Sequence, residues 1–213
     1  LVDGSYRVVG ELTDAPEGAG IALMVRSVLA RTSPELYTGL EPLGPFFTAL
    51  RRSLARATSS PSARVAVLAA AYDPRYVEHA FLATQLGYNV VTADDLTVHR
   101  GRVWLRAVGG LEPIDVIIRA IDSDDCDPLE TGLHTIGVAG LVQAARADTV
   151  ALSNAIGTGL AARLGHLLAE VCPHLLGEPL QLAAAADGDP LRSTMPLMNA
   201  DGEVAPGLGV LRL

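Results

Sequence analysis

The stretch IDVIIRAIDSDDCDPLE, residues 114–130, places a run of branched apolar residues directly before a cluster of acids. Its first half has the length and composition of a strand buried on both faces of a parallel sheet. Arg119 and Asp122 follow where this strand ends. In open α/β folds, ligands bind at the carboxyl ends of the strands. The stretch therefore predicts an α/β fold and the edge of its sheet that would hold a ligand.

A second signal of the same kind is TVALSNAIGTG, residues 149–159. Its apolar start predicts a strand, and Asn154, Gly157, Thr158 and Gly159 predict a loop that leads into a helix. Glycines let the backbone come close to a ligand, and the N-terminus of the next helix favours anions. These four residues are candidate cofactor-binding residues, and the alternative is a plain strand-to-helix turn.

Strand-like and helix-like segments alternate between these two signals and around them. Apolar runs of the buried type predict strands at residues 65–68, 90–91, 116–118 and 150–152. Helical patterns cover residues 75–87, 140–147 and 160–177, and a hairpin is predicted around Arg100 and Gly101. Strands separated by helices form parallel sheets with right-handed crossovers. We therefore expect an α/β fold with a mostly parallel sheet.

The two ends of the chain follow other patterns. Residues 5–12 alternate like a strand, residues 21–32 and 44–58 have helical periodicity, and SPEL at residues 33–36 is typical of a helix start. SSPSA at residues 59–63 is the predicted domain boundary. Beyond residue 181, two turn signals between short apolar pieces predict a hairpin.

The composition limits the classes of function. The chain has 213 residues, of which 49% are hydrophobic, and a net charge of −8 at pH 7. It can therefore form a core, and its acidity argues against binding nucleic acid. All 16 basic residues are arginines, so a phosphate would be held by arginine, by backbone N–H groups or by a metal.

The sequence also predicts a cytoplasmic protein. No apolar run has the length that crosses a membrane, and no signal peptide is recognisable. Cys126 and Cys172 lie far apart in the sequence, which is typical of reduced thiols. Leu1 begins the chain within a strand-like pattern, so we expect an internal piece of a longer protein.

Arg119 and Asp122 are the candidate catalytic residues, because they lie where a buried strand becomes a loop. Arg119 can bind a phosphate or a carboxylate through paired hydrogen bonds, and Asp122 can orient that group or face a metal. Alternatively, the two side chains pair with each other and fix the end of the strand. If the functional interpretation holds, replacing Arg119 with alanine should reduce activity more than stability.

Two further pairs are candidate ligands. Glu11 lies on the first predicted strand, and Thr13, two residues later, points to the same face, so both can offer oxygen to a metal. Glu78 and His79 lie on the helix after the strand at 65–68 and can bind a polar substrate. The alternatives are a surface acid for Glu11, and a surface acid beside a core histidine for the second pair.

Several of these motifs together resemble a known family. They are GELTDAPEGAG at residues 10–20, YVEHAFLATQLGYNVV at 76–91, DLTVHRGRVWLR at 95–106, IDVIIRAIDSDDCDPLE and SNAIGTG. The chain is similar to circularly permuted ATP-grasp proteins of type 2, and distantly to glutathionylspermidine synthase. The resemblance implies a Rossmann-like pre-ATP-grasp domain at residues 61–182. It also implies partial ATP-grasp elements at residues 1–60 and 183–213.

The resemblance implies an activity as well. Proteins of this type use ATP and magnesium to phosphorylate a carboxylate, and an amine then attacks the acyl phosphate to form an amide. It implies a small substrate that is peptide-like or amino-acid-like, and it is compatible with a protein partner or a homo-oligomer. Arg192 matches a later segment of the family and is implied as a further cofactor-binding residue.

Other positions depart from the family pattern. ALMVR at residues 22–26 replaces the usual ALENR, and the pattern around Arg119 keeps one arginine and two acids. By this comparison, the segment that clamps ATP with a lysine is missing between Leu182 and Leu191. The alternative function is therefore a non-catalytic ATP-grasp-like scaffold or ligand-binding domain. We expect this chain to bind ATP weakly or not at all.

Overall fold

A computed structural model describes residues 7–8, 12–37, 40–130, 136–160, 164–184, 197–198 and 204–205 of the chain. By packing, the chain forms two units. One unit comprises residues 14–156, and the other comprises residues 1–13 and 157–213. None of the described helices is long and apolar enough to span a membrane.

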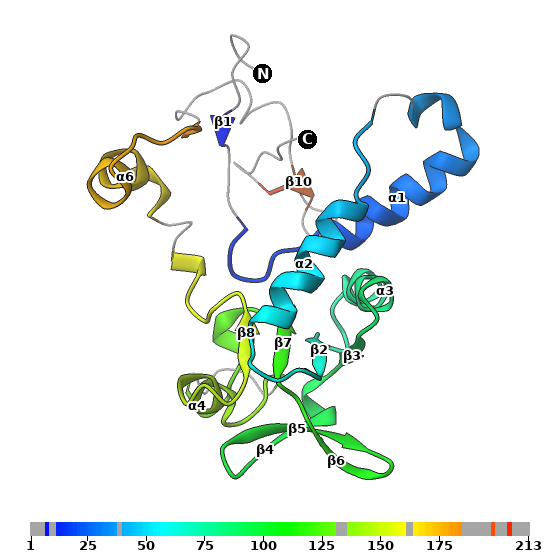
Figure 1. Ribbon diagram of the computed structural model, residues 1–213, viewed down its shortest axis with the longest axis vertical. Coiled ribbons are helices and arrows are strands. Elements are labelled where there is room, and N and C mark those ends of the chain that lie inside the picture. Colours follow the sequence, from blue (N-terminus) through cyan, green and yellow to red (C-terminus); the bar gives the residue numbers. More distant parts are fainter. Residues whose placement is uncertain are drawn as a thin grey trace. The chain divides into compact units, whose positions relative to one another are not determined.

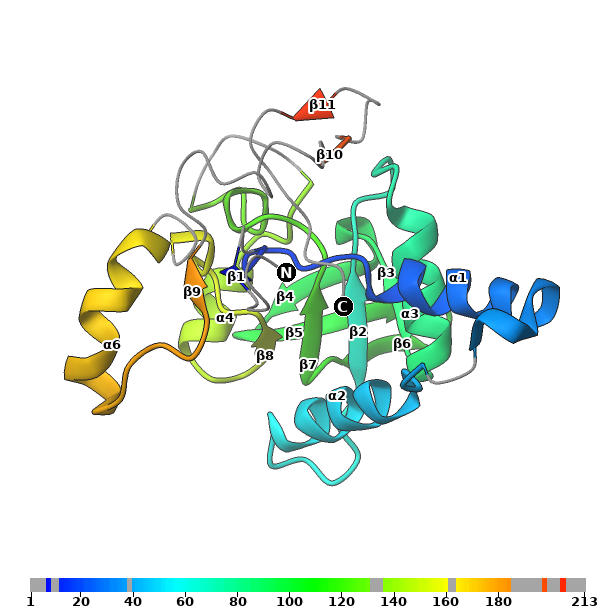
Figure 2. The same ribbon diagram turned by 90° about the horizontal axis from the view of Figure 1, so that it is seen from above.

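A four-stranded parallel sheet forms the centre of the unit at residues 14–156 (Figure 2). Its strands are β2 (Val65–Leu68), β3 (Asn89–Val91), β7 (Val116–Arg119) and β8 (Ala151–Ser153), in the order β3-β2-β7-β8. All four predicted strands are confirmed, and no end of a strand differs from the prediction by more than one residue. The parallel direction is also confirmed.

One face of this sheet packs against two helices. Val65 and Val116 pack with Leu54 of α2 (Gly44–Arg56). Val67 packs with Ala83 of α3 (Tyr76–Leu86). α3 ends at Gly87, whose φ of 75° is the left-handed conformation that favours glycine, as the sequence predicts. Alternate residues of the central strands therefore supply one continuous apolar face.

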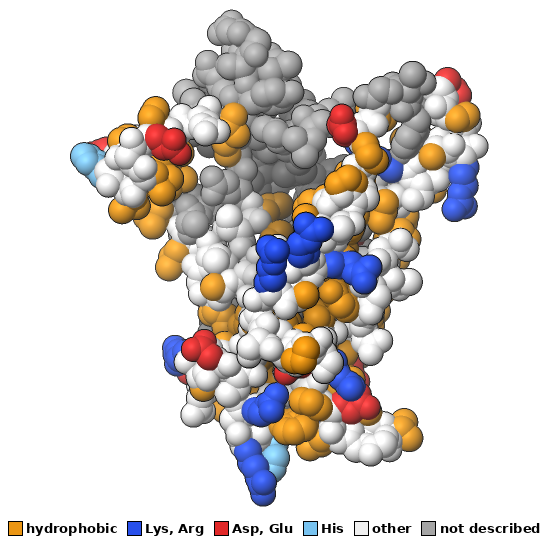
Figure 3. All heavy atoms as spheres, viewed as in Figure 1, with side chains coloured by type: hydrophobic (Ala, Val, Ile, Leu, Met, Phe, Trp, Pro, Cys, Tyr) orange, Lys and Arg blue, Asp and Glu red, His pale blue; other side chains and the backbone are white. Residues whose placement is uncertain are grey.

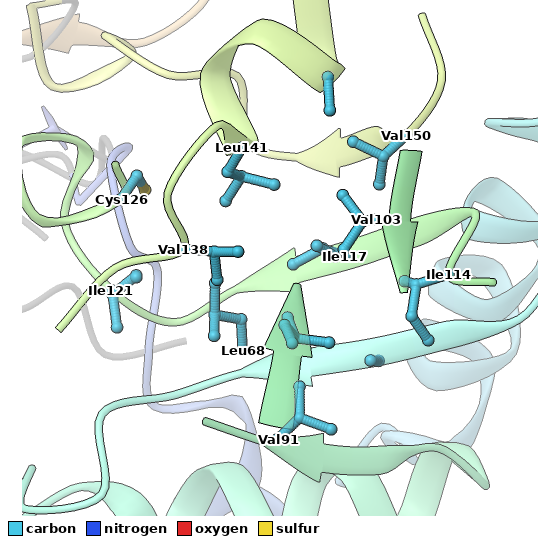
Figure 4. Close-up of a cluster of buried hydrophobic side chains, with 13 residues drawn as sticks. Leu68, Val91, Val103, Ile114, Ile117, Ile121, Cys126, Val138, Leu141 and Val150 are labelled. Carbon is cyan, nitrogen blue, oxygen red and sulfur yellow. The ribbon is translucent and has the colours of Figure 1, made fainter. Parts of the chain in front are cut away.

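The opposite face packs against α4 (Leu141–Arg146) and a second, antiparallel sheet (Figure 4). Leu68 and Ile117 point to this side, where Val103 and Leu141 complete the cluster. The second sheet contains β4 (Leu96–His99), β5 (Arg102–Ala107) and β6 (Gly110–Pro113). Because both faces of the parallel sheet are covered, its strands are apolar runs rather than alternating patterns.

The predicted hairpin is confirmed at the turn between β4 and β5 (Figure 1). Arg100 and Gly101 both have positive φ values, 51° and 74°, as a two-residue hairpin turn requires. The sequence did not predict β6, which pairs antiparallel with β5. Pro113 and Glu112 lie on this edge strand, where proline and charge are tolerated.

The helices near the N-terminus differ in part from the prediction. α1 (Ala19–Thr32) and α2 are confirmed, whereas SPEL forms only a 3₁₀ turn, η1 (Pro34–Tyr37). On α2, Arg51, Arg52 and Arg56 lie on the exposed face, which Figure 3 shows as a group of basic side chains. The apolar face of α2 lies on the sheet, so the arginines take the solvated side.

In the other unit, β1 (Arg7–Val8) pairs in parallel with β9 (Ala183–Ala184). Within the helix predicted at residues 160–177, the structure has a 3₁₀ turn, η4 (Gly165–Leu167), followed by α6 (Leu168–Leu176), and residues 161–163 lie outside the described residues. α6 ends at Gly177, as predicted. The predicted C-terminal hairpin is confirmed, since β10 (Leu197–Met198) and β11 (Val204–Ala205) pair antiparallel.

The mixed α/β class with a parallel sheet and helices is thus the observed fold class. The Rossmann-like detail and the ATP-grasp elements at the chain ends stay predictions. The segment at residues 59–63 has no helix or strand, and α2 shares its packing with β2 across it. The family-based division into residues 1–60, 61–182 and 183–213 also stays a prediction.

Candidate ligand-binding edge of the sheet

Arg119 is the last residue of β7, so it lies at the carboxyl edge, as predicted. Its side chain is completely buried. Nη1 donates to the carbonyl of Ile121 at 2.7 Å, and Nε donates to the carbonyl of Asn154 at 3.3 Å. Nη2 lies 2.7 Å from a carboxylate oxygen of Asp14. The ion-pair partner of this arginine is therefore Asp14, and the alternative pairing with Asp122 is not the one observed.

Asp14 is the functional candidate that sequence reasoning missed. Its carboxylate accepts hydrogen bonds from the backbone N–H of Ser123 at 2.9 Å and from the Ser123 hydroxyl. Its backbone carbonyl accepts a second bond from Arg119 Nη2 at 2.6 Å. Partial burial raises the pKa of Asp14, but the bonds from Ser123 and the charge of Arg119 outweigh it and lower the pKa below 3.8.

Asp122 has a different environment. It precedes the 3₁₀ turn η3 (Ser123–Asp125), and its side chain is exposed. Among the described residues, none donates a hydrogen bond to its carboxylate. Partial removal of the carboxyl group from water and the negative charge of Asp14 raise the pKa of Asp122 above 3.8. The positive charge of Arg75 opposes this change. This carboxylate therefore holds a proton more readily than an ordinary surface aspartate does.

Asp127, a further acid of this cluster, has a structural role. Asp127 is buried, and its carboxylate accepts bonds from the backbone N–H groups of Leu129, Gly140 and Val142, between 3.0 and 3.1 Å. Gly140 is the N-cap of α4, so Asp127 satisfies donors at the start of this helix. The sequence alone did not distinguish this buried acid from its exposed neighbours.

Cys126 is fully buried, and its Sγ donates to the carbonyl of Asp122 at 3.2 Å. Burial raises the pKa of the Cys126 thiol to about 11. In a Cys172→Ser variant at pH 8, the native protein should react with a chromogenic disulfide on the order of 100-fold slower than the unfolded chain. A native rate equal to the unfolded rate would show that this thiol is accessible and ionised.

A second ion-pair group lies in the loop after β2. Arg75 makes two bonds of 2.8 Å to the two carboxylate oxygens of Asp73, through Nε and Nη2. Its Nη1 donates to Glu17 at 2.6 Å. The hydrogen bonds that Arg75 donates to Asp73 are the main cause of a raised pKa for Arg75. Both arginines at this edge are thus paired with carboxylates of the chain itself.

Glu78 and His79 are both buried. Glu78 Oε1 accepts bonds from the N–H groups of Gly18, at 2.6 Å, and Gly20, at 3.2 Å, at the start of α1. A side chain at Gly20 would approach Glu78 Cγ to 2.8 Å, so the two helices meet closely at this glycine. Burial lowers the pKa of His79. Glu78 is therefore not a surface acid, and that alternative is wrong. The alternative that His79 is a core histidine is confirmed. A role of the two residues in substrate binding stays a prediction.

The predicted cofactor loop begins at Asn154, whose φ of 62° is left-handed, and continues through Gly157 with a φ of 89°. Asn154 meets the Arg119 guanidinium through its carbonyl, so these two predicted residues lie together. Thr13 and Thr158 also lie together, because each hydroxyl donates to the carbonyl of the other residue at 2.8 Å. The binding roles of this loop, Gly159 included, stay predictions.

The predicted metal site is only partly within the described residues. Glu11 lies outside them, and so does Arg192, the further cofactor-binding residue implied by the resemblance. The Thr13 hydroxyl donates its proton to the Thr158 carbonyl, so its oxygen keeps lone pairs for a metal. In the described part of the chain, no three His, Cys, Asp or Glu side chains form a group that would hold a metal ion. The metal-binding role of Glu11 and Thr13 stays a prediction.

Known proteins resemble this chain over most of its length. A family model described as circularly permuted ATP-grasp type 2 matches residues 1–187. An uncharacterized protein of Mycobacterium tuberculosis is 36% identical over 186 residues, which cover 84% of this chain and 21% of the relative. An uncharacterized protein of Synechocystis sp. is 31% identical over 164 residues, which cover 74% of this chain and 34% of the relative.

The chain thus spans about a fifth of the length of the mycobacterial relative. The distant similarity to glutathionylspermidine synthase stays a prediction. The match over residues 1–187 includes both units of the structure, and it covers β7, the acidic loop and the Asn154 loop. The chain therefore belongs to the circularly permuted ATP-grasp type 2 family.

Proposed function

We propose that the protein is an ATP-dependent ligase that joins a carboxylate to an amine through an acyl phosphate. The family match over residues 1–187 is the observation that carries this proposal. In this reaction, the carboxylate takes the γ-phosphoryl group of ATP and ADP leaves. The amine then attacks the acyl carbon, and phosphate leaves as the amide forms. The proposed substrates are small and peptide-like or amino-acid-like.

The carboxyl edge of the sheet would bind the amine substrate. Asp122 is exposed and negatively charged, so it can bind an ammonium group. Its raised pKa also suits it to take a proton from the attacking amine. Arg119 and Asp14 hold the loop on which Asp122 lies. Magnesium would bind together with ATP in this family, and no group of three His, Cys, Asp or Glu side chains in the described part of the chain would hold it alone.

ATP itself would be held mainly by other parts of the protein. Among the described residues, Arg75 and Arg119 are the arginines at the carboxyl edge, and both are paired with carboxylates. The chain has no lysine. We therefore expect the 213-residue chain to bind Mg-ATP with a Kd weaker than about 10 μM, which calorimetric titration measures. A Kd tighter than this would assign the nucleotide site to this chain.

The second candidate is a non-catalytic scaffold or ligand-binding domain. The engagement of both arginines within the chain supports it, since neither is available for a phosphate without breaking an ion pair. A homo-oligomer or a protein partner would fit this alternative. A cytoplasmic location is proposed for either function.

The two functions are distinguished by isotope transfer. The protein at its natural length is incubated with ATP, Mg²⁺, hydroxylamine and a mixture of L-amino acids and dipeptides labelled with ¹⁸O in their carboxyl groups. A ligase moves one ¹⁸O atom into the released phosphate, because that oxygen bridges the acyl phosphate. ATP consumption without label in phosphate would contradict the ligase reaction, and no ATP consumption would favour the scaffold.

A further inference from the structure

The residues on both sides of Asp122 are held by one network. On one side, the Ile121 carbonyl accepts a 2.7 Å bond from Arg119 Nη1. On the other side, the Ser123 N–H and hydroxyl both donate to the carboxylate of Asp14. Asp14 also accepts a charged hydrogen bond from Arg119 Nη2. This ion pair therefore connects the contact at Ile121 with the contacts at Ser123.

The backbone of Asp122 itself is held as well, since its carbonyl accepts the thiol of Cys126 at 3.2 Å. The Asp122 carboxylate takes part in none of these bonds and is exposed. Three contacts therefore fix the main chain around this residue while its charged group faces outward. Such support by surrounding hydrogen bonds is what holds a ligand-binding side chain in one geometry.

We propose that Asp14 is a positioning residue, which fixes the loop at residues 121–123 so that the Asp122 carboxylate is presented to the amine substrate. This inference rests on the proposed function for the role of Asp122. Asp14 itself contacts no substrate. It acts through Ser123 and Arg119, and its place 109 residues before Ser123 joins the loop ahead of α1 to the end of β7.

The same arrangement gives Asp14 an electrostatic effect on Asp122. The negative charges of Asp14 and Asp125 raise the pKa of the Asp122 carboxyl group, and the positive charges of Arg75 and Arg119 lower it. Asparagine in place of Asp14 keeps nearly the same shape and one acceptor oxygen but removes the charge. The Asp122 carboxyl should then lose its proton at lower pH than in the wild type.

The experiment uses the protein at its natural length and compares the wild type with the variants Asp14→Asn and Asp94→Asn. Asp94 is exposed, so its substitution makes the same change in charge away from the network. Carboxyl ¹³C NMR follows the titration of Asp122, and ADP formation is measured with the amino-acid and dipeptide mixture, whose own amino groups attack the acyl phosphate. Asp14→Asn should lower the midpoint of the Asp122 titration and reduce kcat by about 10- to 100-fold, with unchanged affinity for Mg-ATP. Asp94→Asn should match the wild type.

A wild-type titration of Asp122 and a wild-type kcat in Asp14→Asn would overturn the inference. Changes of the same size in the Asp122 titration and in the kcat of Asp94→Asn would also overturn it. If Asp14→Asn does not fold, Ser123→Ala takes its place, because it removes one bond to Asp14 and leaves every charge. It should lower kcat without changing ATP affinity, and a wild-type kcat would again overturn the inference. If the wild type forms no ADP, the proposed function fails, while the NMR titration still decides whether Asp14 acts on Asp122.

Discussion

Replacing Arg119 with alanine is expected to lower the free energy of unfolding by about 3–5 kcal/mol. The guanidinium is completely buried, and its loss leaves the Asp14 charge without its partner. The carbonyls of Ile121 and Asn154 lose their donors in the same step. Urea denaturation of the variant and the wild type measures the difference.

Arg146→Ala is the matched control, because Arg146 forms an ion pair with Glu130 in which 68% of the arginine side chain is exposed. Such a surface pair contributes about 1 kcal/mol or less. Equal losses in the two variants would show that the Arg119 network does not hold the end of β7. The sequence favoured a larger effect of Arg119 on activity than on stability; the burial of the guanidinium changes that expectation.

Gly137→Ala is expected to destabilise the protein by about 3 kcal/mol or more. A Cβ atom at this position would lie 2.1 Å from the Asp125 carbonyl oxygen and 2.4 Å from the Cys126 carbonyl carbon. These are backbone atoms, so they cannot move aside by a change of rotamer. The adjacent Val138 N–H donates to the Cys126 carbonyl at 2.9 Å, and this bond fixes the close approach.

Gly109→Ala provides the comparison for this variant. Gly109 lies in the turn between β5 and β6, and an added Cβ atom would meet nothing within 4 Å. This change should leave stability within about 1 kcal/mol of the wild type. Thermal and urea unfolding of both variants measure the contrast. If Gly137→Ala unfolds at the same denaturant concentration as Gly109→Ala, the acidic loop is not packed against residue 137.

The strands were predictable because their signals are local. Val65–Leu68 and Val116–Arg119 are apolar runs that only a sheet covered on both faces can bury, and the observed strands lie there. Gly87 marked the end of α3 for an equally local reason, since its φ is positive. The Arg100–Gly101 turn was predictable for the same reason, because both of its residues have positive φ values.

The site was less predictable because its partners are distant in the sequence. Asp14 lies 105 residues before Arg119, and nothing in TDAPEGAG distinguishes this acid from Glu17. Glu78 has the spacing of a helix-surface acid, but it is buried where the start of α1 supplies two N–H donors. Only the packing of separate loops at one edge of the sheet creates these contacts.

The central claim is that Asp122, at the carboxyl edge of the sheet, acts on the substrate of an ATP-dependent ligase. Its most direct test is ADP formation by the natural-length protein and its Asp122→Asn variant, with ATP, Mg²⁺ and the amino-acid and dipeptide mixture, whose own amino groups attack the acyl phosphate. We predict that Asp122→Asn binds Mg-ATP as the wild type does and forms ADP about 100-fold more slowly. ADP formation at the wild-type rate in Asp122→Asn, or no ADP formation by the wild type, would contradict the claim.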